Sequence, residues 1–318
     1  MKTILMNSAV VLSMVSLAVS AEETSTSFSW GNVTFQPRAY AGYANYSLDS
    51  DIFTFIRDSD HAMAQGPLNF DALETLHKID INGFLWGLGG TVASGRFFGD
   101  IYYQSTLNET VQSGTGLNLE EYTFNIGGVK AQHSDWAVSL GYMITDQWSV
   151  FAGYKSGSTE SDQSYQGYTN SPNRQLIENG SLDTKFDQDG PFLGTSYSFP
   201  IGSGALTIKA AYAYLNGDFE WNNQVLDYPP LNPLIITQQY KLDGNSNAFS
   251  LGISWTQSLM DNLGYSLGAN YHRYDFDMSG TSTGSVQNVP DPSYAGTITN
   301  GSLTEELFTI TASIFYRF

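Results

Sequence analysis

Residues able to carry catalysis are sparse in this chain of 318 residues, which holds four histidines and no cysteine. A general acid–base or nucleophilic site needs partners that converge to hydrogen-bond distance. Two groups place a histidine near carboxylates in the sequence: Asp58 and Asp60 with His61, and His272 with Asp275. His77 and His133 stand isolated, and without cysteine there is no thiolate nucleophile or thiolate metal ligand. We therefore expect no enzyme and no cofactor.

Acidic residues outnumber basic ones by 31 to 13, and they gather in stretches that we interpret as loops. The stretch 48–73 alone contains Asp49, Asp51, Asp58, Asp60 and Asp71. The run Asp187-Gln188-Asp189-Gly190 resembles a fragment of a calcium-binding loop, but the distal glutamate of that motif is missing. We predict no metal site, and the net charge of −18 argues against a nucleic-acid partner.

Apolar and polar residues alternate along much of the chain with the period of a β-strand. In 136–144 and 148–155 the alternation is sharpest, with Trp136, Tyr142, Trp148 and Tyr154 on one face and a short turn at Asp146-Gln147. The other segments that we interpret as strands are 34–46, 77–93, 96–107, 192–201, 205–219, 247–259, 263–277 and 307–318. The count is ten strands, or twelve if 121–130 and one loop segment are also full strands of the same sheet.

The last strand has apolar residues at every second position and ends on an aromatic residue. Its apolar face consists of Phe308, Ile310, Ala312, Ile314, Tyr316 and Phe318, and Phe315 is the one exception on the polar face. This segment resembles the closing strand of bacterial outer-membrane β-barrels. The resemblance implies that the six residues form the recognition signal for the barrel-assembly machinery, and that the closing strand pairs with the first strand around 35–43.

The first 21 residues form a separate unit that we interpret as a signal peptide. A short positive start precedes a mostly apolar run, and Val19-Ser20-Ala21 offers small residues at a cleavage site. A transmembrane anchor is the alternative, but the run contains several polar residues and is short for a span of about 20. We expect cleavage after Ala21, which leaves 22–318 as one barrel domain in the outer membrane of a Gram-negative bacterium.

Composition and loop pattern support a transmembrane, antiparallel, up-and-down all-β barrel. Charged residues make up 14% of the chain, against about 25% in ordinary soluble domains. After residue 21 no long apolar run follows, and only helices or closed barrels satisfy all backbone groups in lipid. The long loops expected at 48–73, 156–190, 220–245 and 279–302 alternate with short turns, as in outer-membrane barrels. Within 108–134, the segment 121–130 is interpreted as a strand that either projects above the membrane or crosses it. The alternative fold, a secreted β-sandwich or lectin, does not require long loops at one end and short turns at the other.

Strand phase predicts which polar side chains face the barrel interior. The predicted set is Arg38, Asp80, Asn82, Asp100, Gln104, Lys155, Lys209, Asn270, His272 and Arg317. Because the lumen of a barrel with eight to twelve strands is narrow enough for side chains to fill it, these charges either pair and plug the interior or line a small polar channel.

The barrel resemblance leaves three functions open. A porin or channel for ions or small polar solutes is the first hypothesis, and a non-conducting surface barrel for adhesion, reception or envelope structure is the alternative. A barrel hydrolase is the third, although omptin proteases set an Asp–His pair against an Asp pair and the spacings of Asp58, Asp60, His61, His272 and Asp275 do not match. The implied partners are outer-membrane lipid and lipopolysaccharide, the latter bridged through divalent cations to acidic loops.

Overall fold

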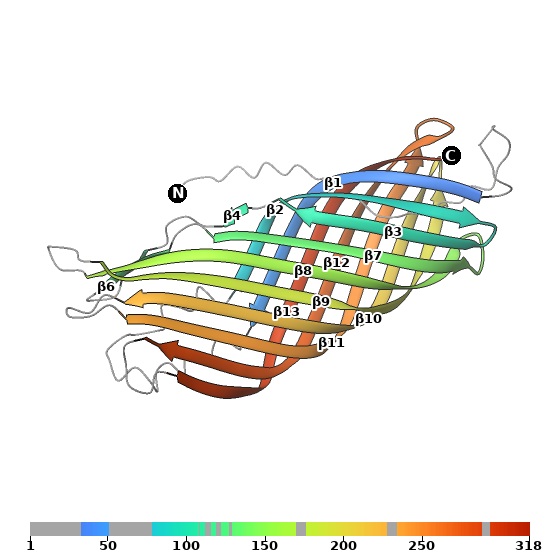
Figure 1. The fold of residues 1–318 in the computed structure, drawn as a ribbon. Coiled ribbons are helices and arrows are strands. Elements are labelled where there is room, and N and C mark those ends of the chain that lie inside the picture. Colours follow the sequence, from blue (N-terminus) through green and yellow to red (C-terminus); the bar gives the residue numbers. More distant parts are fainter. Residues whose placement is uncertain are drawn as a thin grey trace, which may run out of the picture.

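Ten long antiparallel strands form a closed ring. The computed structural model describes residues 33–50, 78–107, 109–111, 116–118, 122–126, 129–169, 176–227, 234–287 and 293–318. The order around the ring is β1-β2-β3-β7-β8-β9-β10-β11-β12-β13, with β13 paired back to β1 (Figure 1). The bounds are β1 Val33–Ser50, β2 Lys78–Ser94, β3 Phe97–Thr106, β7 Val129–Met143, β8 Trp148–Thr169, β9 Leu176–Ile201, β10 Gly204–Asp227, β11 Leu234–Ser258, β12 Leu263–Val286 and β13 Ser293–Tyr316. The prediction of an antiparallel barrel with ten strands is confirmed.

Three short strands extend the ring at one end without adding to it. β4 (Glu109–Val111) pairs with β7, β6 (Tyr122–Ile126) pairs with the far end of β8, and β5 (Gly116–Asn118) pairs with β6. The region 121–130 therefore adds no further member to the ring, and the alternative of twelve strands is wrong. The signal peptide predicted at 1–21 lies outside the described residues.

The first and last strands close the ring as predicted. Their register runs from Arg38 opposite Phe315 to Ser50 opposite Leu303. Beyond the end of β13, the backbone amide of Phe318 donates a hydrogen bond of 2.8 Å to the carbonyl of Phe35, and the two phenyl rings stack with centroids 6.2 Å apart. The terminal aromatic residue thus contributes to closure through backbone and side chain.

Short turns join the strands at the end of the ring where β1 begins and β13 ends. Two of these turns, after Ser94 and after Ile201, have Gly95 and Gly202 at positive φ (58° and 59°). A two-residue hairpin turn of this type needs a positive φ at its first central residue, which glycine adopts without steric cost. We call this end the short-turn end and the opposite one the long-loop end. No helix in the described part of the chain is long and apolar enough to cross a membrane.

A band of exposed apolar side chains surrounds the ring next to the short-turn end. Leu88, Ile101, Leu140, Leu193 and Ile314 lie within this outer apolar band. Aromatic side chains border it on both sides, as at the two interfaces of outer-membrane barrels. Near the short turns these are Phe35, Phe97, Tyr142, Trp148, Tyr197, Phe199, Tyr316 and Phe318; toward the long-loop end they are Tyr43, Phe84, Tyr103, Trp136, Tyr154, Tyr212, Tyr214, Phe249, Tyr271 and Phe308.

The strands continue far beyond this band, which overturns three of the predicted loops. Most of 156–190, 220–245 and 279–302 is strand, because β8 to β13 are 22 to 26 residues long. About 9–11 residues are enough to cross a bilayer. We call the part of the ring between the band and the long-loop end the extension. Figure 1 shows it as a continuation of the same curved wall.

The apolar face of each strand changes sides where the extension begins. On β10, Ile208, Tyr212 and Tyr214 point outward, whereas Leu215 and Phe219 are buried inside the ring. The outer surface of the extension is polar and its interior is packed with apolar side chains. Because the wall passes from lipid into water, the exterior no longer needs to be apolar while the interior still has to be filled. This inversion interrupts the alternation and made the extension resemble a loop.

Candidate functional site

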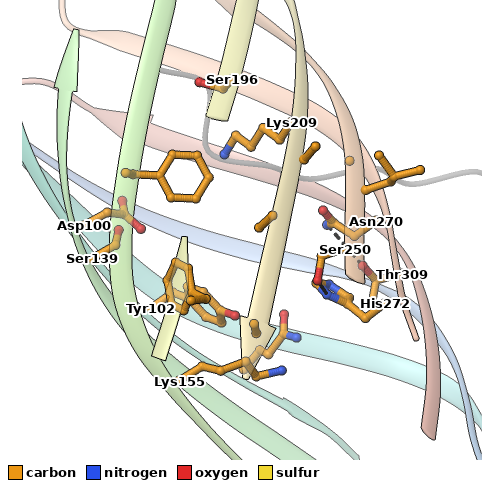
Figure 2. A pocket seen from close by; sticks show the side chains of 18 of the residues that line it. Asp100, Tyr102, Ser139, Lys155, Ser196, Lys209, Ser250, Asn270, His272 and Thr309 are labelled. Atoms are coloured by element: carbon orange, nitrogen blue, oxygen red, sulfur yellow. Dashed lines mark hydrogen bonds between the residues drawn. The ribbon is translucent and has the colours of Figure 1, made fainter. Parts of the chain in front are cut away.

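A cavity of about 210 Å³ lies inside the ring at the level of the outer apolar band (Figure 2). Seven of the predicted interior residues are on its wall: Arg38, Asp100, Gln104, Lys155, Lys209, Asn270 and His272. They come from five strands, β1, β3, β8, β10 and β12, and further lining residues come from β7, β9, β11 and β13. The cavity therefore depends on closure of the whole ring.

Asp80 is not in this group, and its prediction is wrong. It pairs with Ser47 on the outer face of the ring, in phase with Asn82, while Ile79 and Ile81 pack against the apolar core inside. An interior Asp80 requires the two isoleucines to face lipid, but this part of β2 belongs to the extension, where the apolar face is the inner one. Asn82 points outward for the same reason and accepts a hydrogen bond of 2.5 Å from Asn45.

Arg317 follows the end of β13 at the short-turn end. Its side chain is half-buried, and its backbone amide donates a hydrogen bond of 2.7 Å to the carbonyl of Asn262. It does not line the cavity. The interior position nearest to this end of β13 is filled by Phe315, which is buried.

Arg38 and Asp100 form an ion pair on the cavity wall. The guanidinium Nη1 and Nη2 lie 2.7 and 2.9 Å from Oδ2 and Oδ1 of the carboxylate. The hydroxyl of Thr91 donates to Asp100 at 2.6 Å and accepts from Arg38 at 3.1 Å. Since β1, β2 and β3 are neighbours, the three side chains meet across adjacent strands. Such a two-point contact fixes the orientation of the guanidinium relative to the carboxylate, and the two charges neutralise each other.

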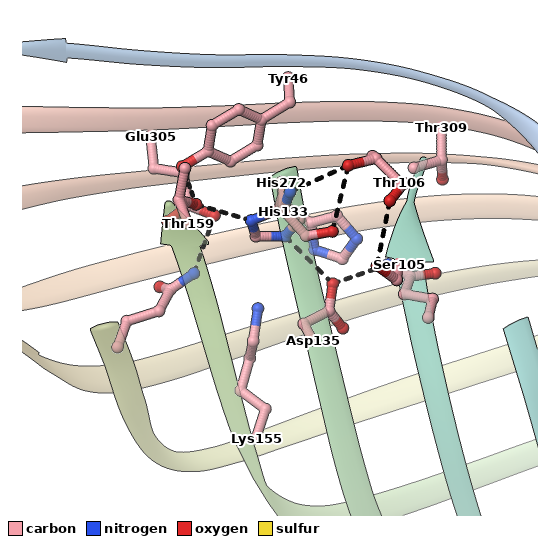
Figure 3. A network of polar contacts seen from close by, with 12 residues as sticks. Tyr46, Ser105, Thr106, His133, Asp135, Lys155, Thr159, His272, Glu305 and Thr309 are labelled. Carbon is pink, nitrogen blue, oxygen red and sulfur yellow. Dashed lines mark hydrogen bonds and ion pairs between the residues drawn. The ribbon is translucent and has the colours of Figure 1, made fainter. Parts of the chain in front are cut away.

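A network of buried polar side chains lies next to the cavity, toward the long-loop end (Figure 3). His133 Nε2 is 3.3 Å from Asp135 Oδ2, and Gln104 donates to the same carboxylate oxygen at 2.7 Å. His133 Nδ1 lies 2.8 Å from the hydroxyl of Thr159, which is 2.6 Å from the hydroxyl of Tyr46. The rings of Tyr46 and His133 also stack, with centroids 4.4 Å apart. His133 is 1% exposed, and both of its ring nitrogens have protein partners, so the imidazole is shielded from bulk water.

Two further contacts cross the interior at this level. Lys155 of β8 donates a hydrogen bond of 2.7 Å to the hydroxyl of Tyr274 on β12, and its ammonium lies 4.4 Å from the centroid of that ring. Gln188 of β9 donates to Glu305 of β13 at 2.8 Å. One carboxylate oxygen each of Asp135 and Glu305 has no hydrogen-bond partner among the described residues.

These contacts join strands that are far apart in the ring. Tyr46 on β1 reaches Thr159 on β8 across β2, β3 and β7, and Lys155 on β8 reaches Tyr274 on β12 across β9, β10 and β11. Further along the axis, Phe186 of β9 meets Phe276 of β12 edge to face at 5.1 Å. Side chains from opposite walls therefore meet at several heights above the cavity.

Sequence reasoning missed most of the network. His133 is not isolated, because Asp135 lies two residues further on the same strand and faces the same side. That spacing is a usable signal, but the strand predicted from the sequence begins only at Trp136, after His133 and Asp135. Tyr46, Thr159, Gln188, Tyr274 and Glu305 carry no local signal, since their partners are on distant strands.

The suspected hydrolytic pair of His272 and Asp275 does not form. His272 faces the interior, where Nδ1 lies 2.8 Å from the hydroxyl of Ser250, whereas Asp275 is on the outer face and binds Arg273 at 3.0 Å. The other group, Asp58, Asp60 and His61, lies outside the described residues, as does His77. Asp187 and Asp189 point outward while Gln188 points inward, and no cluster of three metal-ligating side chains occurs in the parts that the structure describes.

The outer face of the extension carries carboxylates on neighbouring strands. Asp218 of β10 is directly opposite Asp243 on β11 and Asp187 on β9. Partial burial, followed by the negative charge of these neighbours, raises the pKa of Asp218 above its ordinary value. Burial and the nearby Asp162 raise the pKa of Asp183 in the same way. These acids are therefore harder to ionise than isolated surface carboxylates.

Comparison with known proteins supports the fold and leaves the activity open. No protein-family model matches the chain, and no curated protein matches its sequence. The outer membrane protease OmpT from Escherichia coli is similar in structure, with a TM-score of 0.51 and 12% identity over 92% of this chain and 99% of that one. The translocator domain of the autotransporter NalP from Neisseria meningitidis also aligns (TM-score 0.38, 11% identity, 89% and 88% coverage), as does a FadL homologue of Pseudomonas aeruginosa (0.33, 10%, 90% and 90%).

The closed antiparallel ring, the outer apolar band and the match to OmpT define the chain as having the bacterial outer-membrane β-barrel fold. At 12% identity the match extends to the fold alone.

Proposed function

We propose that this chain is a surface barrel of the Gram-negative outer membrane with a closed lumen, and that it acts in adhesion, reception or envelope structure through its extension and loops. One observation carries the proposal: side chains from opposite walls meet across the interior. Tyr46 to Thr159, Lys155 to Tyr274 and Gln188 to Glu305 are direct hydrogen-bonding contacts between distant strands.

The apolar interior of the extension supports closure. Phe186, Phe219, Phe276, Leu215 and Leu303 are at most 1% exposed, so they pack as a core rather than line a wet passage. A water-filled channel exposes its wall to solvent, whereas a narrow barrel filled by side chains does not conduct. The polar outer wall then becomes the large surface presented to other molecules.

Planar-bilayer recordings test closure directly. Refolded protein whose band shifts on a gel between unheated and boiled samples is expected to insert without stepwise conductance. The gel shift ensures that an unfolded sample is not counted as a closed barrel. Stepwise, ion-selective conductance from the shifted form overturns the proposal.

Because the chain contains no cysteine, single engineered cysteines can test which end of the barrel faces the outside of the cell. We expect Ser279→Cys, on the outer face of the extension, to react with a membrane-impermeant maleimide on intact cells. The matched control Ser203→Cys, in the turn after Ile201, is expected to react only after lysis. Labelling with the opposite pattern, or recovery of the protein as a soluble periplasmic species, contradicts the assignment.

A porin-type channel for ions or small polar solutes is the second candidate. The cavity with its charged wall favours it, because these residues would set selectivity if a passage opens through the interior. Under that hypothesis, Lys155→Ala or Lys209→Ala shifts the ion selectivity of the conductance, and unchanged selectivity excludes these residues from the conducting path.

We also propose a non-enzymatic role, with lipopolysaccharide, outer-membrane lipid and the barrel-assembly machinery as partners. His133 has an aspartate partner, but the ring of Tyr46 covers it and the apolar core separates it from the long-loop end. OmpT is a protease, so the relevant test is a screen of the purified barrel for peptide and phospholipid turnover. Turnover that His133→Ala abolishes would establish a hydrolase instead.

A further inference from the structure

Three basic side chains lie on the cavity wall, and Lys209 differs from the other two in its hydrogen bonding. Arg38 is bound by Asp100, and Lys155 is bound by Tyr274. Lys209 makes no hydrogen bond to a described residue, and no carboxylate in the described part of the chain lies within 4.0 Å of its ammonium. Figure 2 shows its amine pointing into the cavity, between the wall with Asp100 and the wall with Asn270.

An ammonium group in such a place is a strong attractor for an anion. Removing a charge from bulk water is unfavourable unless a counter-charge or hydrogen bonds replace the lost hydration. Asp100 is nearby, but both of its oxygens are already bound by Arg38. A bound anion would supply the contact that the described residues do not.

The rest of the wall is suited to an apolar group. Phe98 and Phe151 line the cavity and lie against the inward positions of Gly141 and Gly194. A Cβ at either glycine would come within 2.1 Å or 2.4 Å of a ring atom. The rings therefore use the space that a side chain would occupy, and they lie along the wall instead of filling the cavity. Phe192 packs edge to face on Phe151, with centroids 6.2 Å apart.

We propose that this cavity binds a small organic monocarboxylate, with the carboxylate on Lys209 and the apolar body on the phenyl rings. A volume of about 210 Å³ is somewhat larger than the roughly 150 Å³ of an engineered apolar cavity that binds benzene, which limits the ligand to a short chain or a single ring. One uncompensated lysine matches a monoanion better than a dianion. The proposal does not depend on whether the barrel conducts.

The experiment measures binding of benzoate to the folded, detergent-solubilised barrel by calorimetry, with benzamide as the neutral isostere. We expect Lys209→Met to weaken benzoate binding by about 30-fold or more, as for loss of one partner of a buried charge pair. Lys209→Arg keeps the charge and should remain within a few-fold of the parent. Lys241→Met removes an exposed lysine that pairs with Glu220 on the outer face, so it should leave binding unchanged.

Three results overturn the proposal: no benzoate binding by the parent barrel, equal binding of benzamide and benzoate, or equal affinity in Lys209→Met and the parent. Chloride or phosphate that displaces benzoate at equal concentration overturns the apolar half of the site. Each variant must show the gel shift of a folded barrel. If Lys209→Met does not fold, Lys209→Arg combined with the benzamide comparison still decides the matter. Conductance is measured separately, so failure here is distinguishable from failure of the closed-lumen proposal.

Discussion

Removal of Asp100 should destabilise the barrel more than removal of any surface carboxylate. The side chains of Arg38 and Asp100 are only 6% and 9% exposed, and two short hydrogen bonds join them. Asp100→Ala leaves the guanidinium with the Thr91 hydroxyl as its remaining hydrogen-bond partner among the described residues. Breaking a buried pair in this way costs about 3–5 kcal/mol of unfolding free energy, whereas replacing both partners with apolar residues is close to neutral. Arg38→Met/Asp100→Leu should therefore recover most of the loss.

Urea unfolding of the barrel in lipid vesicles, followed by tryptophan fluorescence, measures these differences. The matched control is Asp275→Ala, which breaks the Arg273–Asp275 pair on the outer face, where the side chains are 49% and 57% exposed. Exposed pairs contribute about 1 kcal/mol or less. The reasoning is refuted if Asp100→Ala costs no more than Asp275→Ala, because Arg38 would then be solvated by water and the interior would be wet.

Two further predictions concern the closing strand and the outer wall. Deleting Phe318 removes two backbone hydrogen bonds and one ring contact with Phe35, together with the ring contact with Tyr316, so the purified barrel should lose only about 2–3 kcal/mol. The amount of folded, heat-shifted barrel recovered from cells should fall by much more than this loss of stability explains. If the cellular yield falls only in proportion to the stability of the purified barrel, a role of Phe318 in assembly is contradicted. Asp218→Asn should be more stable than the parent at pH 7, with no difference below about pH 4. The folded-state pKa of Asp218 is raised, so its favourable contribution is present at low pH and is lost as pH rises through that pKa. Urea unfolding at both pH values checks this, and an equal difference at both contradicts it.

The membrane-embedded half of the barrel was predictable because lipid imposes a local rule. Each crossing strand must present apolar side chains at alternate positions, so 136–144, 148–155 and 307–318 could be identified without knowing their neighbours. The same rule placed Arg38, Asp100, Lys155, Lys209 and His272 on the inner face.

The extension was not predictable by that rule, because it applies only where the outside is lipid. Beyond Tyr214 the apolar residues of β10 move to the inner face, and the corresponding change on β2 put Asp80 on the wrong side. A test for alternation in the opposite phase, directly after each aromatic border, would have found Leu215, Phe219 and their equivalents.

Alternation and the aromatic closing strand determined the fold class, the strand count and the closure of β13 on β1, since these follow from the environment of each strand taken alone. Only the tertiary structure decided which interior side chains meet. Ring size and the register summed over all ten strands decide that Tyr46 contacts Thr159 and that Arg38 pairs with Asp100. They also decide that Lys209 has no hydrogen-bond partner among the described residues. No single segment specifies the ring size or the combined register of the strands. The closed interior and its cavity are therefore properties of the assembled ring.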